Sequence, residues 1–250
     1  MKVELLTHNM EKEYEEFLQS NDQALFNASL LQRDFIRTLC PDVIPYYFVA
    51  IEDSKIVGAL PSFMKKGKLG PVLNSMPWFG SNPGIITENR TAFEMLLKAF
   101  DSTAKWTDCF SSTIISPPNQ DQAFYEYYFS GKEVFCDPRS GLVTKLPDFT
   151  DIEQFAKSLL QKVHSKTRNQ ILKSIQTCQV YESYTDDDWN FLKQTHKENM
   201  QAVGAAFKEK EFDVIKKHFI KGADYKLYVA FTNDGKAERI AALLVEYYNK

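Results

Sequence analysis

The residues best suited to bind a charged ligand lie just past the middle of the chain, in the stretch VHSKTRNQILKS (163–174). Lys166 offers a mobile point charge, Arg168 a rigid fork of donors for a phosphate or carboxylate, and Asn169 a further donor. Ser165 is expected to cap a helix that begins here. Because the helix macrodipole favours anions at the first turn, cations there are unfavourable unless an anion joins them. We interpret the stretch as an anion clamp, and the alternative is a solvated basic helix face.

A second group of candidates lies in the loop SMPWFGSNPGIIT (75–87). Trp78 and Phe79 can stack on a sugar or a base, and Gly80 permits close approach of the backbone. Asn82 adds donors and an acceptor to the same loop. The loop is therefore a candidate lining of a substrate cleft, and the alternative is a loop that its aromatic side chains pin to the core.

Acidic residues near the end of the chain raise two further possibilities. Glu246, on the last expected strand, is a candidate general base for an amine nucleophile, or else a solvent-facing strand residue. Asp186, Asp187 and Asp188 resemble the metal-binding DxD of nucleotide-sugar glycosyltransferases. They precede an amphipathic run, however, where acids are typical of a helix start. The histidines and cysteines are scattered without ligand spacing, so we expect no metal.

Composition bounds the class of protein. The chain has 250 residues, 44% of them hydrophobic and 14% aromatic, enough to bury one large core or two smaller ones. A net charge of −3 excludes a global field that attracts nucleic acid, although 151–175 carries five basic and two acidic residues. The sequence shows neither a signal peptide nor an apolar run of transmembrane length, so we expect a cytoplasmic protein with reduced cysteines.

Hydrophobic periodicity in the first half predicts the order β-α-α-β-β-β-α-β-α-β-β over 2–146. Asn9 is the expected cap of the first helix. The expected helices cover 9–20, 28–39, 88–104 and 120–131, and the expected strands cover 2–7, 46–51, 55–64, 69–75 and 108–116, with a hairpin over 132–146.

The second half, after the Pro/Asp turn at 147–151, repeats the beginning of this order. Two helical stretches come first, and Ile171, Leu172 and Ile175 are expected to give the second one a buried face. A strand, two helices and an Asp-Gly hairpin follow, with Gly222 as the expected C-cap of the last helix. We predict an α/β fold of mixed sheets in two copies, 1–147 and 148–250, the second incomplete at residue 250.

This order of elements resembles the GNAT acyltransferase fold, and two such domains joined by a basic helix resemble the FemAB family of peptidoglycan-bridge aminoacyltransferases. The similar stretches are IVGALPSFMKKGK…LNSMPWFGSNPGI (56–85), LLQKVHSKTRNQILKS (159–174) and DDDWNFLKQTHKENM…EFDVIKKHF…RIAALLV. In the family, basic residues of the second stretch contact the phosphates of a nucleotide-linked substrate, a role that Lys166 and Arg168 would inherit. The first domain departs from the GNAT pattern, because GSNPG (80–84) stands where a pyrophosphate-cradling loop would lie and Pro83 lacks an N–H. We therefore assign no acyl-CoA site to the first domain.

The resemblance implies a transferase that moves an acyl or aminoacyl group onto an amine of a cell-envelope or surface-polysaccharide precursor. Its donor would be acyl-CoA or aminoacyl-tRNA, so tRNA is an expected partner beside a nucleotide-linked or other small substrate. Such chemistry depends on positioning and oxyanion stabilisation and needs no metal. The alternatives are a GNAT-like module that binds a phosphorylated, nucleotide-linked ligand without catalysis, and a small-molecule N-acetyltransferase.

Overall fold

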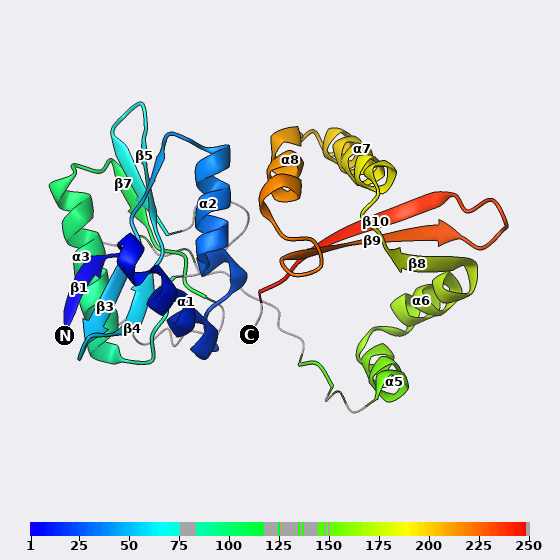
Figure 1. Ribbon diagram of the computed structural model, residues 1–250, viewed down its shortest axis with the longest axis horizontal. Helices are drawn as coiled ribbons and strands as arrows, with labels where there is room; N and C mark the ends of the chain where they lie inside the picture. The colour runs from blue at the N-terminus through cyan, green and yellow to red at the C-terminus, as the bar shows by residue number, and fades with distance from the viewer. Residues whose placement is uncertain are drawn as a thin grey trace. The chain divides into compact units, whose positions relative to one another are not determined.

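The structure is a computed structural model, and it describes residues 1–75, 84–117, 125, 135, 137, 145–147, 149 and 151–248. The chain divides into two compact units (Figure 1). The first unit comprises Met1–Arg139, Asp213–Phe219 and Tyr248–Lys250, and the second comprises Ser140–Phe212 and Ile220–Tyr247. The helix expected at 120–131 and the hairpin expected at 132–146 lie almost wholly outside the described residues.

The first unit contains two sheets. The antiparallel strands β1 (Lys2–Leu5), β3 (Phe48–Glu52) and β4 (Lys55–Leu60) form one, in the order β1-β3-β4. The other has the order β2-β5-β6-β7, made of Val43–Pro45, Phe63–Lys66, Pro71–Asn74 and Ser111–Thr113. The helices of this unit are α1 (Glu11–Ser20), α2 (Leu30–Leu39) and α3 (Arg90–Trp106).

The core of the first unit explains why β3 is almost wholly apolar. Phe48 and Ala50 lie in one cluster with the buried stripe of α3, which includes Phe93 and Leu96. Tyr47, on the opposite side of β3, lies against Tyr14 of α1 with 5.9 Å between ring centroids. Helices therefore cover both faces of the strand, and its first four residues are buried.

The expected strand over 55–64 is wrong, because the structure divides it into β4 and β5. Pro61 lies at the break, and proline has no N–H to donate to a sheet ladder. The chain thereby passes from the first sheet to the second. Strand β6 then pairs with β7 in parallel, and α3 lies between them in the sequence, so these three elements form a β-α-β unit.

The second unit is built on an antiparallel sheet with the order β10-β9-β8 (Figure 1). Trp189 of α7 lies against Tyr225 of β9 and Phe212, at centroid distances of 5.7 and 6.4 Å. The elements are α5 (Ile152–Lys162), α6 (Ser165–Thr177), β8 (Cys178–Glu182), α7 (Asp186–Ala202), β9 (Tyr225–Thr232) and β10 (Arg239–Glu246). The division between the units falls within α8 (Glu209–His218), between Phe212 and Asp213.

The prediction of a repeated β-α-α-β-β pattern is confirmed. In each case the strand before two helices pairs antiparallel with a strand that follows them, β1 with β3 and β8 with β9, and a hairpin adds the third strand. The first unit has an additional strand, β2, between α2 and β3, and it belongs to the other sheet. The copies also differ in how their sheets are covered. Burial alternates residue by residue in the first half of β9, as in a sheet covered on one face, whereas β3 is covered on both.

Three expected details of the helix ends are wrong. Met10, not Asn9, precedes α1, because the short 3-10 helix His8–Met10 runs directly into it. His164, not Ser165, is the N-cap of α6, since its extended backbone lets Nδ1 accept from Lys166 N at 3.3 Å. Helix α8 ends at His218, and Gly222 lies in the following turn, with a φ of 81° and an N–H that donates to Tyr225 O.

Candidate functional site

The Arg168 side chain lies at the junction of α5 and α6. Its Nε donates to Leu160 O at 2.9 Å, and one Nη donates to Val163 O at 3.3 Å and Gln161 O at 3.4 Å. These carbonyls belong to the last turn of α5 and the residue after it, where a helix leaves its carbonyls without partners. A cation at this end also complements the negative pole of the α5 macrodipole.

This contact accounts for the basic first turn of α6. A cation in a first turn opposes the macrodipole of its own helix, and for Arg168 the negative pole at the carbonyl end of α5 compensates. The other Nη of Arg168 makes no hydrogen bond with any described residue, so it keeps donors for a ligand. The substrate-binding role of Arg168 remains a prediction beside its structural one.

Lys166 and Asn169 lie on the exposed side of α6. Both residues are exposed, and within the described ranges neither side chain makes an ion pair or hydrogen bond. With Lys173, which is also exposed, they share a face, because positions i, i+3 and i+7 align on a helix. The expected buried face of α6 is wrong: Leu172 is 44% and Ile175 64% exposed, and none of the described elements buries them.

The loop with Trp78, Phe79, Gly80 and Asn82 lies outside the described residues, but the structure shows what holds its two ends. Ser75, fully buried, donates its N–H to Thr113 O at 2.9 Å and accepts from Ile115 N on Oγ at 2.8 Å.

At the far end of this loop, Gly84 has a φ of 47°, and a Cβ there would lie 2.5 Å from Pro117 Cδ. Both ends therefore meet the segment that follows β7. Beside them, the buried Oδ1 of Asn74 has no hydrogen-bond partner among described residues. The carboxyl end of a parallel strand pair is the usual ligand position in α/β sheets.

Glu246 lies at the end of β10, opposite Tyr225 in the ladder with β9. It is an exposed residue, yet desolvation by the surrounding protein raises the pKa of its carboxyl group. A raised pKa is suited to a general base that must later release a proton near neutral pH. Its catalytic role stays a prediction.

The three aspartates at 186–188 form the first turn of α7, after the N-cap Thr185. The Asp188 carboxylate is 4% exposed and accepts from Ser183 Oγ, Thr185 Oγ1 and Arg239 Nε. Burial alone would raise its pKa, but these hydrogen bonds and the Arg239 charge outweigh that effect and lower it. Asp188 thus ties the start of α7 to β10, a contact across 51 residues that no local spacing reveals.

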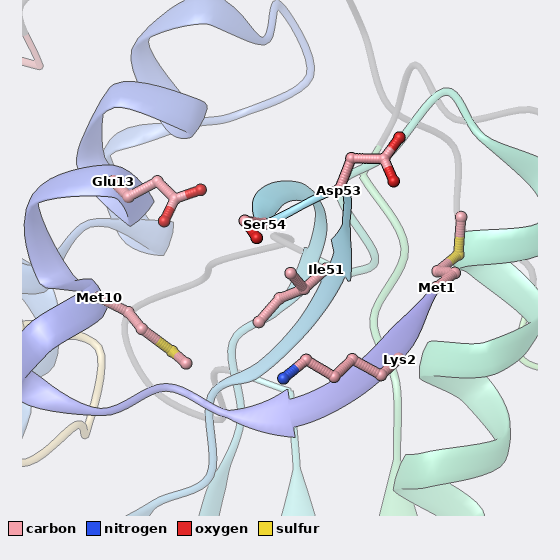
Figure 2. A pocket seen from close by; sticks show the side chains of 7 residues that line it. All are labelled: Met1, Lys2, Met10, Glu13, Ile51, Asp53 and Ser54. Carbon is pink, nitrogen blue, oxygen red and sulfur yellow. The ribbon is translucent and has the colours of Figure 1, made fainter.

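Figure 2 shows a hollow of the first unit between β1, α1 and the β3–β4 turn. Glu13 points into it, and its Oε1 accepts from Ile56 N at 2.8 Å. Asp53 and Ser54 form the turn with φ values of 49° and 63°, as in a two-residue hairpin of type I′. The carboxylate is thus engaged in holding the hairpin, and we assign the hollow no ligand.

No group of His, Cys, Asp and Glu side chains in the described ranges has the arrangement of a metal site. None of the described helices is long and apolar enough to cross a membrane.

Comparison with known proteins gives a likeness of fold. No family model matches the chain, and no curated protein matches it in sequence. The crystal structure of FemX superposes with a TM-score of 0.67 and 13% identity, over 92% of this chain and 58% of FemX. The fold is similar to that of FemX. This chain thus spans less than two thirds of the length of FemX.

Two N-acetyltransferase structures match less closely. One is a ribosomal-protein-alanine N-acetyltransferase from Brucella melitensis, with 14% identity and a TM-score of 0.37 over 58% of this chain and all of that one. Another is a glucosamine-6-phosphate N-acetyltransferase from Arabidopsis thaliana, with 15% identity and a TM-score of 0.36 over 60% and 98%. TM-scores this low establish nothing further about the chain.

Proposed function

We propose that this protein is an acyl or aminoacyl transferase that acts on an amine of a cell-envelope or surface-polysaccharide precursor. The observation that carries the proposal is the FemX-like fold over 92% of the chain, with two copies of the same strand and helix pattern. The donor is an activated acyl ester or thioester, either acyl-CoA or aminoacyl-tRNA.

The reaction we propose is attack of the free amine on the activated carbonyl. The amine forms the new C–N bond and gives a proton to a base, the C–S or C–O bond to the donor breaks, and the proton passes on to the departing thiolate or alkoxide. Glu246, whose pKa desolvation raises, is the proposed base. The protein otherwise orients the two substrates, which is worth several powers of ten in rate.

The proposed acceptor site lies at the start of α6. Lys166 and Asn169, both exposed, would bind the phosphates of a nucleotide-linked acceptor. Arg168 would contribute its remaining Nη while its other donors hold α5. Separately from this site, the loop residues Trp78, Phe79, Gly80 and Asn82 stay predicted contacts for a sugar or base.

Binding of a nucleotide-linked amino sugar, measured by calorimetry, tests the acceptor site. We expect Lys166→Ala to weaken binding at least tenfold, whereas Lys157→Ala, an exposed lysine of α5 paired with Glu153, leaves it unchanged. Equal affinity of wild type and Lys166→Ala would refute the phosphate clamp. Binding that persists without transfer from either donor would instead support the non-catalytic binding module.

Glu246→Gln tests the base separately. Its transfer rate should fall by about a hundredfold or more, with acceptor affinity unchanged, since general-base catalysis contributes about 10²–10⁴. Glu238→Gln, at the exposed start of the hairpin's second strand, serves as the control. An undiminished rate would remove Glu246 from the mechanism.

A further inference from the structure

A groove of about 760 Å³ lies in the first unit, away from the residues assigned above. The 3-10 helix with the start of α1, helix α2, and strand β2 with Pro41 before it form its walls. Charged side chains line one part of it, and Pro41, Val43, Ile44 and Pro45 line another. The groove thus combines polar and aliphatic surface.

Arg33 organises the charged part. Its side chain is 13% exposed, and it donates through Nη1 to Glu11 at 2.8 Å. It also grips both oxygens of Asp34, through Nε at 2.9 Å and Nη2 at 3.3 Å. Burial alone would lower the pKa of Arg33, but its hydrogen bonds to Asp34 and Glu11 raise it. One buried guanidinium therefore serves two carboxylates and has little left for a ligand.

Arg37 differs from Arg33 in this respect. Its side chain is 55% exposed, and its nearest carboxylate oxygen, on Asp34, lies 3.7 Å from Nη1, beyond hydrogen-bond distance. Since Arg33 already binds both Asp34 oxygens, most of the Arg37 donors remain for another acceptor. Arg37 is thus a cationic pole that suits a carboxylate.

Glu11 supplies the opposite pole. Its second oxygen lies 3.0 Å from Nδ1 of the exposed His8. The two arginines and the two acids, Glu11 and Asp34, leave no net formal charge between them. A polyanion would meet two carboxylates here, whereas a ligand that carries both an ammonium and a carboxylate matches both poles. The aliphatic wall, where Ile44 is 57% exposed, suits an apolar side chain.

We infer that this groove binds a zwitterionic amino acid or short peptide with an aliphatic side chain. The carboxylate pairs with Arg37, the ammonium lies toward Glu11, and the side chain rests on Pro41 and Ile44. The inference stands apart from the proposed transfer reaction, because none of these residues takes part in it.

Binding of the dipeptide Ala-Leu, followed by amide NMR shifts of the whole protein, tests this. We expect shifts at Thr38 and Ile44, which line the groove, and at least tenfold weaker binding of both the C-terminally amidated and the N-acetylated dipeptide. Arg37→Gln should bind the free acid and the amide equally weakly. Arg90→Gln, a half-exposed arginine of α3 outside the groove, should behave as wild type.

Three results would overturn the inference. One is equal binding of the free and the amidated dipeptide by wild type, and another is undiminished binding by Arg37→Gln. The third is tighter binding of pyrophosphate than of Ala-Leu at the same amides, which would make the groove an anion site. Ile44→Ser, at a position that is 57% exposed, should weaken Ala-Leu binding severalfold and leave acetate binding unchanged.

Discussion

At the scale of one residue, Arg168 stabilises the end of α5 and still has hydrogen-bond donors available for a ligand. Three of its hydrogen bonds go to the carbonyl end of α5. Arg168→Ala should therefore lower the unfolding free energy of the second unit by about 1–2 kcal/mol, the range of a few partly exposed hydrogen bonds from a charged group. Urea unfolding measures this, and Lys166→Ala, whose side chain makes no hydrogen bond or ion pair with any described residue, should unfold as wild type.

The pattern of substitutions separates the two roles of Arg168. Arg168→Ala with unchanged stability and weakened ligand binding would contradict the capping role. Loss of stability with unchanged binding, by contrast, would leave Lys166 and Asn169 as the proposed acceptor contacts. Arg168→Lys should recover only part of the stability, because an ammonium cannot reach the spread carbonyls as a planar fork does.

Asp188 makes the stability of the second unit depend on pH. Its carboxyl pKa is lowered in the fold, so the charged form stabilises the protein above the pKa of the unfolded chain. This contribution is lost as pH falls through the folded pKa. We expect wild type to lose stability steeply below about pH 4, and Asp188→Asn to lose less over the same range while being about 1–3 kcal/mol weaker at pH 7. Parallel pH profiles of the two proteins would show that Asp188 is not the group responsible.

Gly84 matters at the scale of the loop that it ends. A Cβ there would lie 2.5 Å from Pro117 Cδ and 2.9 Å from Ser116 Cα, besides the strain of its positive φ. Gly84→Ala should destabilise the first unit by about 2 kcal/mol or more and thereby lower its melting temperature. Gly235→Ala is the matched control, since its φ of 82° carries strain but no neighbour lies within 4 Å. Equal losses in both variants would exclude the close contact as the cause.

Sequence periodicity predicted most of the described elements, because apolar spacing reports which face each one buries. Periodicity failed where something other than apolar spacing determines where an element begins, ends or packs. Pro61 turns an apolar run into two strands of different sheets, and a 3-10 turn displaces the cap from Asn9. The apolar residues of α6, such as Ile175, have the spacing of a buried face without any described element to cover them.

The candidate site was only partly predictable for a related reason. Residue types alone marked Lys166 and Arg168 as cations at a helix start, which is where the structure has them. They did not reveal that α5 turns its carbonyls to Arg168, because that depends on the two-residue bend at Val163 and His164. Asp188 and Arg239 are 51 positions apart and meet only through the sheet.

At the scale of the whole molecule, two similar halves were predicted from the order of elements along the chain. The prediction held because a β-α-α-β-β order leaves few ways to pair three strands with short connections. In the first half of β9 buried and partly buried residues alternate, whereas the first four residues of β3 are all buried. The copies therefore differ in how their sheets are covered. The chain shares its fold with FemX over 92% of its length. Because one fold can host many functions, the chemistry has to be measured.

The most direct test of the transferase account is a transfer assay with a nucleotide-linked, amine-bearing peptidoglycan precursor as acceptor. Acetyl-CoA and aminoacyl-tRNA are supplied in turn, and mass spectrometry follows the acceptor. We predict a mass increase of one acyl or aminoacyl group with one of the two donors, at least tenfold slower for Lys166→Ala than for Lys157→Ala. An acceptor that binds but gains no mass with either donor would contradict the account.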